Sequence, residues 1–151
     1  METSVGRKLQ LDLVDTEGAA VPLGGDSATF VYFMRAPSCA QCNSAVRKLA
    51  AQQEALKRNG VEVVIALPTD SSGARAWKES KSVALTVATG RVGSAHEEAG
   101  LLRRVFGLVQ QSGGILVDRE GTVRYSHIAT NPGDSLRPQE LDHAVDLLSA
   151  A

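Results

Sequence analysis

Both cysteines of this 151-residue chain lie within four consecutive positions, as Cys39-Ala40-Gln41-Cys42. Residues three apart on a helix are neighbours, with Cβ atoms about 5–6 Å apart, so modest adjustment lets the two sulfurs bond. A helix start concentrates partial positive charge and unpaired backbone N–H groups, which favour a thiolate over a thiol. The spacing therefore predicts a dithiol that can cycle between its reduced form and a disulfide.

The residues just before the pair suit the start of a helix. Pro37 is tolerated in a first turn, and Ser38 is the expected N-cap. We expect Cys39 to be the exposed sulfur that attacks, and Cys42, one turn deeper on the apolar face, to resolve the mixed disulfide. Arg35 is a candidate for a positive charge near the sulfurs. The predicted catalytic residues are thus Cys39 and Cys42.

Two other roles for the cysteines must be weighed. Free cysteines are among the most buried residue types, so the pair could belong to the core. A structural zinc needs four ligands, and His96, His127 and His143 do not stand at finger-like spacing. The position of the pair between a strand and a helix favours redox chemistry, which needs neither a metal nor an organic cofactor. We expect His96 and His143 to face solvent, and His127, at a strand end, stays an open candidate for the site.

Composition excludes several other classes of function. The 16 basic and 17 acidic side chains give a net charge of -1, which does not support binding to nucleic acid or to a membrane surface. No apolar run approaches the roughly 20 residues of a membrane span, and the first residues lack the apolar core of a signal peptide. We therefore expect a cytoplasmic protein, where paired cysteines are typically catalytic rather than structural. The oligomeric state stays open.

Short apolar runs, typical of buried strands, alternate along the chain with segments whose apolar residues recur at helical spacing. The patterns predict strands near 29–34, 61–67, 83–87, 114–118 and 122–127, helices over 39–59, 94–107 and from 138 onward, and a hairpin in 9–23. This order predicts one α/β domain over 1–151, with a central mixed five-stranded sheet flanked by helices and an N-terminal β-hairpin. The strand 29–34 should lie near the middle of the sheet and run directly into the cysteines.

The motif and its setting resemble the thioredoxin-like superfamily. The closest resemblance is to the peroxiredoxin-like redoxins, also called the alkyl hydroperoxide reductase/thiol-specific antioxidant group. It is carried by "FVYFMR" running into "APSCAQC" and by "GGILVDREGTVRYSH". The resemblance implies a thioredoxin-like sandwich and an antioxidant or redox role as a thiol–disulfide oxidoreductase. It also implies a thiol, disulfide or peroxide as substrate, and a thioredoxin- or glutathione-type reductant as partner.

The peroxiredoxin pattern is incomplete. In its Pro-x-x-x-Thr-x-x-Cys motif, Cys42 corresponds to the peroxide-attacking cysteine. Cys39 then stands at the position of the threonine, and Arg35 at the position of the proline. The family's active-site arginine would fall near Ser112. A second hypothesis follows from the resemblance: a thiol-dependent peroxidase in which Cys42 becomes a sulfenic acid and Cys39 resolves it.

The thioredoxin pattern is incomplete as well. The place of its cis-proline holds Gly113 or Gly114, whose backbone we expect to be accessible to a partner chain. The tryptophan common before the first cysteine is replaced by Ser38, and Trp77 is expected to be a packing residue. A third hypothesis is a non-catalytic redox sensor or interaction module. Such a module could bind a metal ion with additional ligands from a partner protein.

Overall fold

The computed structural model describes residues 4–104 and 109–150. Its elements are β1 (Leu13–Asp15), β2 (Ala28–Phe33), α1 (Ala40–Ala51), α2 (Gln53–Arg58), β3 (Val61–Ala66), α3 (Ser71–Lys81), β4 (Thr86–Gly90), α4 (Ala95–Glu98), β5 (Arg103–Arg104), β6 (Val109–Gln110), β7 (Ser112–Val117), β8 (Val123–Ala129), the 3₁₀ turn η1 (Pro132–Asp134) and α5 (Pro138–Ala150).

The central sheet is mixed and has six strands, in the order β1-β4-β3-β2-β7-β8. Strands β2, β3 and β4 run parallel to one another, whereas β7 lies antiparallel to both β2 and β8. The predicted α/β class is confirmed, and so is the central place of β2. The sixth strand is β1, which pairs with β4. The expected N-terminal hairpin is reduced to one bridge, between Val14 and Ala20.

Strand β2 is buried along its whole length because both faces of the sheet are covered. Its side chains alternate between two apolar clusters, as the period of a strand requires. Phe30 and Tyr32 lie in the cluster that also contains the two cysteines. Val31 and Phe33 lie in the opposite cluster. The near-continuous apolar sequence of this strand follows from this double burial.

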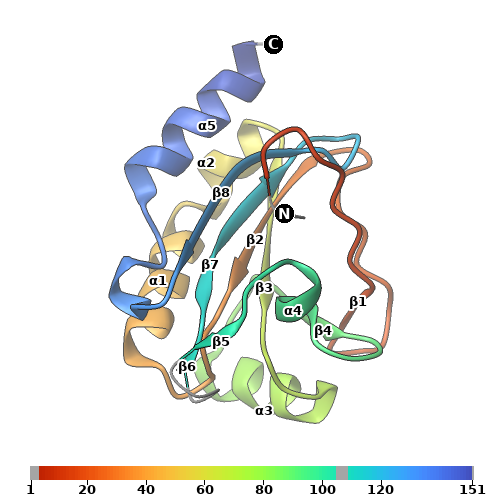
Figure 1. The fold of residues 1–151 in the computed structure, drawn as a ribbon, viewed down its shortest axis with the longest axis vertical. Coiled ribbons are helices and arrows are strands. Elements are labelled where there is room, and N and C mark those ends of the chain that lie inside the picture. The colour runs from red at the N-terminus through yellow and green to blue at the C-terminus, as the bar shows by residue number, and fades with distance from the viewer. Residues whose placement is uncertain (1–3, 105–108, 151) are drawn as a thin grey trace.

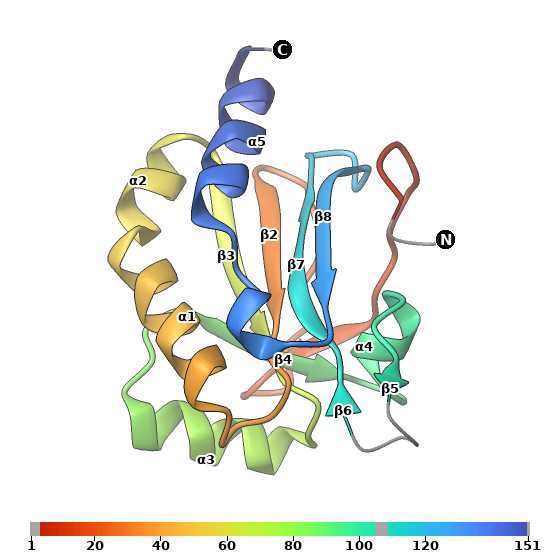
Figure 2. The same cartoon turned by 60° about the vertical axis from the view of Figure 1, so that its left-hand side comes forward.

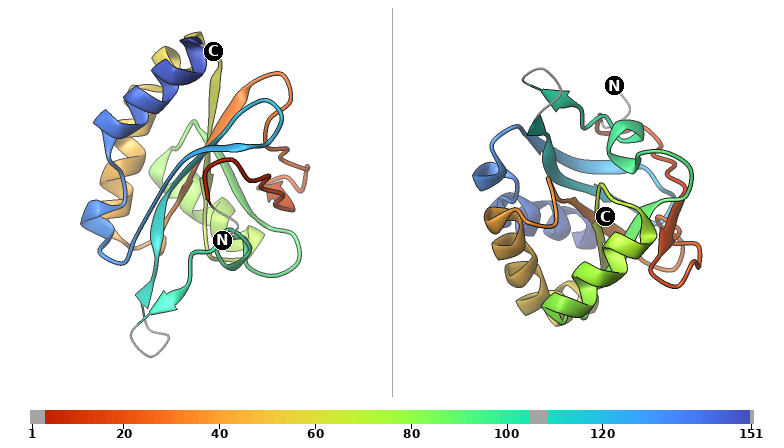
Figure 3. Two further views of the ribbon diagram at one scale, coloured as in Figure 1. Left: turned by 45° about the horizontal axis from the view of Figure 1, so that its top comes forward. Right: turned by 90° about the horizontal axis from the view of Figure 1, so that it is seen from below.

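The two faces of the sheet are covered by different elements (Figure 1). Helices α1, α2, α3 and α5 supply side chains to the cluster around the cysteines. The N-terminal segment and α4 cover the other face. Figure 3 shows α1, α2 and α5 together on one side of the sheet, and the N-terminal segment on the other. The cysteines thus lie on the more fully helix-covered side.

Two predicted helices differ from the structure. The stretch 39–59 forms two helices, because the backbone turns at Gln52, with φ −100° and ψ 3°. Of the described residues 94–104, only those of the short α4 are helical, because Gly100 takes φ +90° two residues beyond its end. Leu102, within the range of this predicted helix, is 39% exposed, and the last residues of that range, 105–107, lie outside the described residues.

The carboxyl end of β2 leads through residues 34–39 into the start of α1 (Figure 2). Open α/β sheets commonly build their sites at this end of the strands. In the described part of the chain, no helix is both long and apolar enough to cross a bilayer.

Candidate active site

Cys39 itself caps the helix that carries the cysteine pair. It has extended backbone angles, and its sulfur accepts a hydrogen bond from the backbone N–H of Cys42 at 3.2 Å. The prediction that Ser38 is the N-cap is therefore wrong by one residue, and Ser38 is exposed. Because α1 begins at Ala40, the sulfur of Cys39 lies at the positive end of the helix dipole.

Both cysteines are free thiols in this structure, and both are buried. Cys39 is 1% exposed and Cys42 is 0% exposed. The expectation that Cys39 is solvent-exposed is thus wrong. Its burial is local, because Ser38, Ala40 and Gln41 around it are all exposed. The amide oxygen of Gln41 lies 4.0 Å from the Cys39 sulfur.

The surroundings of Cys39 favour its thiolate. Burial alone would raise the pKa of Cys39, but the side chain of Cys42, the backbone N–H of Cys42 and the positive charge of Arg35 oppose this. Together these contacts hold the pKa of Cys39 below its usual value. Arg35 therefore acts on the Cys39 sulfur, in agreement with the prediction that it supplies a positive charge near the cysteines.

The pKa of Cys42 is shifted in the opposite direction. Its burial, together with the nearby Cys39, raises the pKa of Cys42 to about 11. Its sulfur accepts a hydrogen bond from the backbone N–H of Arg35 at 3.3 Å, and the hydroxyl of Tyr32 opposes the rise of the Cys42 pKa. The two sulfurs thus differ: the pKa of Cys39 is lowered and that of Cys42 is raised, and the backbone N–H of Cys42 bonds to the Cys39 sulfur.

A buried amide fixes the loop before the helix. Asn43 donates from Nδ2 to the carbonyl oxygens of Pro37, at 2.9 Å, and Cys39, at 2.8 Å. Its Oδ1 accepts the indole N–H of Trp77, also at 2.9 Å. Trp77 is buried in α3, so the prediction of a packing residue is confirmed, and it also anchors the loop through Asn43. Pro37 therefore supports the site through its carbonyl group.

The two glycines named from the sequence do not offer an open backbone. Gly113 and Gly114 lie inside β7, buried, and pair with both β2 and β8. The expectation that a partner chain can reach this backbone is therefore wrong. Glycine is required here for close packing: a Cβ would lie 2.1 Å from the His127 carbonyl oxygen at Gly113, and 2.3 Å from the Phe30 ring at Gly114. Ser112, in the same strand, is fully buried.

The three histidines take three different positions. His96 is 0% exposed, contrary to the prediction that it faces solvent: its Nε2 lies 2.7 Å from the Met34 carbonyl oxygen and its ring packs edge-on against Phe33. His127 contacts the carbonyl oxygen of Asp134 at 2.7 Å, so it holds the turn η1 rather than a sulfur. His143 is exposed, as predicted. Within residues 4–104 and 109–150, no group of three or more His, Cys, Asp or Glu is placed to hold a metal ion.

Sequence reasoning missed four residues at this site: Tyr32, Gln41, Asn43 and Ser135. Two of them carried a signal. Asn43 falls on the apolar stripe of its helix, four residues after Cys39, where a polar side chain needs a partner. Tyr32 lies in a fully buried strand, where its hydroxyl group must find a hydrogen-bond partner. Ser135 comes from a loop over 90 residues away and carried no such signal.

Comparisons with solved structures agree on the fold. A peroxiredoxin-like protein from Aquifex aeolicus matches with 18% identity over 96% of this chain and 87% of its own, with a TM-score of 0.79. AhpC from Enterococcus faecalis matches with 17% identity over 97% and 92% of the chains, with a TM-score of 0.78. A secreted disulfide oxidoreductase of Mycobacterium tuberculosis, homologous to Escherichia coli DsbE, matches with 17% identity over 91% and 96%, with a TM-score of 0.62.

No curated protein has a sequence that matches this chain significantly. The sequence does match the model of the AhpC/TSA family over residues 9–126. That range runs from the N-terminal segment into β8 and includes both cysteines. The chain therefore belongs to the AhpC/TSA family.

Proposed function

We propose that this chain is a thiol–disulfide oxidoreductase in which Cys39 attacks the substrate and Cys42 resolves the intermediate. The observation that carries the proposal is the inequality of the two sulfurs. The pKa of Cys39 is lowered at the helix start beside Arg35, whereas burial raises the pKa of Cys42 to about 11. A thiolate is the nucleophile in disulfide exchange.

The reaction has two steps in the direction of substrate reduction. The Cys39 thiolate attacks one sulfur of a substrate disulfide, a mixed disulfide forms, and the first substrate thiolate leaves. The Cys42 sulfur then attacks Cys39, the internal disulfide forms, and the second substrate thiolate leaves. A thioredoxin- or glutathione-type thiol reduces the Cys39–Cys42 disulfide again. The proposal includes a reducing, cytoplasmic setting, in which such donors are present.

Substrate access is part of the proposal, because neither sulfur is reachable as the side chains stand. The substrate can be a small molecule or an exposed disulfide of a protein. Its approach to Cys39 requires the exposed side chain of Gln41 to move aside. Cys42 stays enclosed between α1 and the sheet, which suits a sulfur that meets only Cys39.

Stopped-flow oxidation of the reduced protein tests the proposal, with a model disulfide and hydrogen peroxide compared at equal concentration. Trp77, whose indole N–H bonds to Asn43 next to Cys42, offers a fluorescence signal. We expect the disulfide to oxidise the protein faster, and Cys39→Ser to abolish this reaction. Faster oxidation by peroxide would contradict the proposal.

A second candidate is a thiol-dependent peroxidase, which membership of the AhpC/TSA family favours. In this alternative Cys42, which aligns with the peroxide-attacking cysteine of the family motif, becomes a sulfenic acid and Cys39 resolves it. The raised pKa of Cys42 weighs against it, because peroxide reacts with thiolates. Rapid peroxide consumption that is lost in Cys42→Ser and kept in Cys39→Ser would establish the peroxidase instead.

A further inference from the structure

One peptide group at the carboxyl end of β2 connects a buried histidine to the Cys42 sulfur. The group joins Met34 to Arg35, directly after the last residue of the strand. Its carbonyl oxygen, on Met34, lies 2.7 Å from Nε2 of His96. Its N–H, on Arg35, donates to the sulfur of Cys42 at 3.3 Å. A single peptide group thus lies between the ring of His96 and the sulfur that we propose resolves the mixed disulfide.

The direction of these hydrogen bonds follows from the chemistry of the groups. A carbonyl oxygen only accepts, so Nε2 of His96 carries the hydrogen and donates it. Burial lowers the pKa of His96 to about 4, so at pH 7 the ring is neutral and its Nδ1 carries no hydrogen. Among the described residues, Nδ1 has no hydrogen-bond partner. The bond to Met34 is therefore the one hydrogen bond that the described residues offer this ring.

The setting of His96 differs from that of a residue that only fills the core. Its ring packs edge-on against Phe33, with the ring centroids 5.2 Å apart, and Ala95 and Ala99 of the same segment are buried in the apolar cluster on this face of the sheet. An apolar side chain would fill this space without leaving a buried nitrogen unpaired. A histidine with its one bond on the Met34 carbonyl oxygen points to a role in placing that peptide group.

The peptide group can transmit the effect of His96 to the sulfur. A hydrogen bond to the carbonyl oxygen of a peptide polarises the group and makes its N–H a stronger donor. A donor that bonds to the charged form of an acid favours that form. In agreement, the Arg35 N–H opposes the rise in pKa that burial gives Cys42. His96 can thus act on Cys42 from the opposite face of the sheet without contacting it.

We propose that His96 is a positioning residue for the resolving step, in which it orients and strengthens the Arg35 N–H that bonds to the Cys42 sulfur. The inference rests on the proposed function. In the resolving step Cys42 loses its proton to the medium, its sulfur bonds to the Cys39 sulfur, and the bond from Cys39 to the substrate sulfur breaks. The electron pair of that bond leaves with the substrate thiolate, so the substrate is reduced and the cysteine pair is oxidised. The Arg35 N–H stabilises the negative charge that Cys42 carries before its new bond forms.

The two steps of the reaction can be timed separately with 5,5′-dithiobis(2-nitrobenzoate). The attack of Cys39 releases one coloured thiolate, and ring closure by Cys42 releases a second. His96→Leu removes the donor to Met34, and we expect it to keep the rate of the first release. The second release should be slowed about two- to fourfold at pH 7, because a Cys42 pKa higher by about 0.5–1 unit leaves less thiolate. His96→Gln keeps an N–H donor and should restore most of this rate.

The order of these two variants separates positioning from packing. If His96 served packing alone, leucine would preserve the second release at least as well as glutamine, because leucine suits an apolar cluster better. A second release as fast in His96→Leu as in His96→Gln would therefore overturn the inference. The amide proton of Arg35 gives a spectroscopic readout: its NMR resonance should move upfield in His96→Leu and much less in His96→Gln. A resonance that stays in place in His96→Leu would contradict the link.

A second pair of variants tests the N–H itself and leaves the core around His96 intact. Arg35 stands at the position of the proline in the family motif, and a proline has no N–H to donate. Arg35→Pro removes both the N–H and the charge, whereas Arg35→Gln removes the charge alone. The second release should be slower in Arg35→Pro than in Arg35→Gln. Equal rates would show that this N–H does not act on Cys42 and would overturn the inference.

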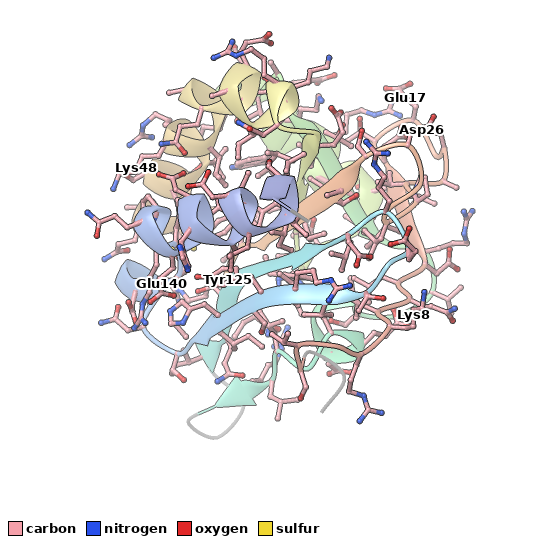
Figure 4. All side chains as sticks on the ribbon, turned by 90° about the horizontal axis from the view of Figure 1, so that it is seen from above. Lys8, Glu17, Asp26, Lys48, Tyr125 and Glu140 are labelled. Atoms are coloured by element: carbon pink, nitrogen blue, oxygen red, sulfur yellow. The ribbon has the colours of Figure 1, made fainter. Side chains whose placement is uncertain are left out.

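The matched control is Tyr125→Phe, which removes a side-chain hydrogen bond elsewhere. Tyr125 donates to Glu140 at 3.0 Å, between β8 and α5 (Figure 4). The bond involves neither β2 nor α1, so this variant should release both thiolates at the rates of the unmodified protein. A second release slowed as much as in His96→Leu would show that the defect is not specific to His96. If the unmodified protein releases only one equivalent, the proposed function fails, and the inference with it.

Discussion

At the residue scale, the side chain of Gln41 lies next to the sulfur that we propose attacks the substrate. It is exposed, it belongs to no apolar cluster, and its amide oxygen lies 4.0 Å from the Cys39 sulfur. Gln41→Ala should therefore raise the rate at which iodoacetamide alkylates Cys39 several-fold, measured by mass spectrometry in a Cys42→Ser background. Gln139→Ala, at an exposed position of α5, is the matched control and should have no effect. An unchanged rate in Gln41→Ala would show that other groups cover Cys39.

Also at the residue scale, Arg35 contributes positive charge to the Cys39 thiolate. Its replacement by a neutral side chain should raise the pKa of Cys39, because the thiolate loses a nearby opposite charge. In Arg35→Gln we expect the midpoint of the alkylation–pH profile to rise by about 1 unit. Arg47→Gln removes an exposed arginine of α1 and should leave the midpoint in place. Equal midpoints for both variants would exclude this role of Arg35.

At the scale of elements, Asn43 joins α1, α3 and the loop before the cysteines. Asn43→Ala leaves the buried N–H of Trp77 and the carbonyl oxygen of Pro37 without their partner. We expect the free energy of unfolding to fall by about 1–3 kcal/mol, measured by urea denaturation. Asn59→Ala removes an exposed asparagine whose Nδ2 bonds to the Ala55 carbonyl oxygen, and it should cost clearly less. A similar loss in both variants would contradict the anchoring role.

The elements that carry the cysteines could be predicted because their signals are local. A run of β-branched and aromatic residues gives β2, and the apolar stripe after Cys42 gives α1. The N-cap shifted by one residue because a cysteine sulfur can accept the backbone N–H usually bonded by serine. The burial of Cys39 and the contact between Tyr32 and Ser135 depend on side chains and loops packed in three dimensions, which no local pattern contains.

At the scale of the whole molecule, the number of strands in the sheet could not be predicted from local patterns either. The pairing of β1 with β4 joins segments about 75 residues apart, and the turn at Glu17-Gly18 favoured a local hairpin instead. The isolated bridge from Val14 to Ala20 is what remains of that hairpin. Long-range pairing thus added the sixth strand.

Whole-molecule stability should depend on pH through His96. Burial lowers the pKa of His96 to about 4, so between pH 6.5 and 4 the unfolded chain binds a proton that the folded chain does not. Stability is therefore lost as pH falls through this range, by up to about 3 kcal/mol from this group.

The measurement is chemical denaturation at pH values between 7 and 4. His96→Gln keeps an N–H donor for the Met34 carbonyl oxygen but cannot titrate, so its free energy of unfolding should fall less steeply with acid. His143→Gln, at an exposed position, should follow the unmodified protein. Parallel curves for His96→Gln and the unmodified protein would show that His96 does not set this dependence.

The most direct test of the account is a trap of the mixed disulfide with glutathione disulfide. In Cys42→Ser the resolving sulfur is missing, so we predict a stable glutathione adduct on Cys39, located by peptide mass mapping. In Cys39→Ser the remaining sulfur is buried and protonated, so we predict little or no adduct. An adduct that accumulates on Cys42 in Cys39→Ser, with none on Cys39 in Cys42→Ser, would contradict the assignment of the two roles.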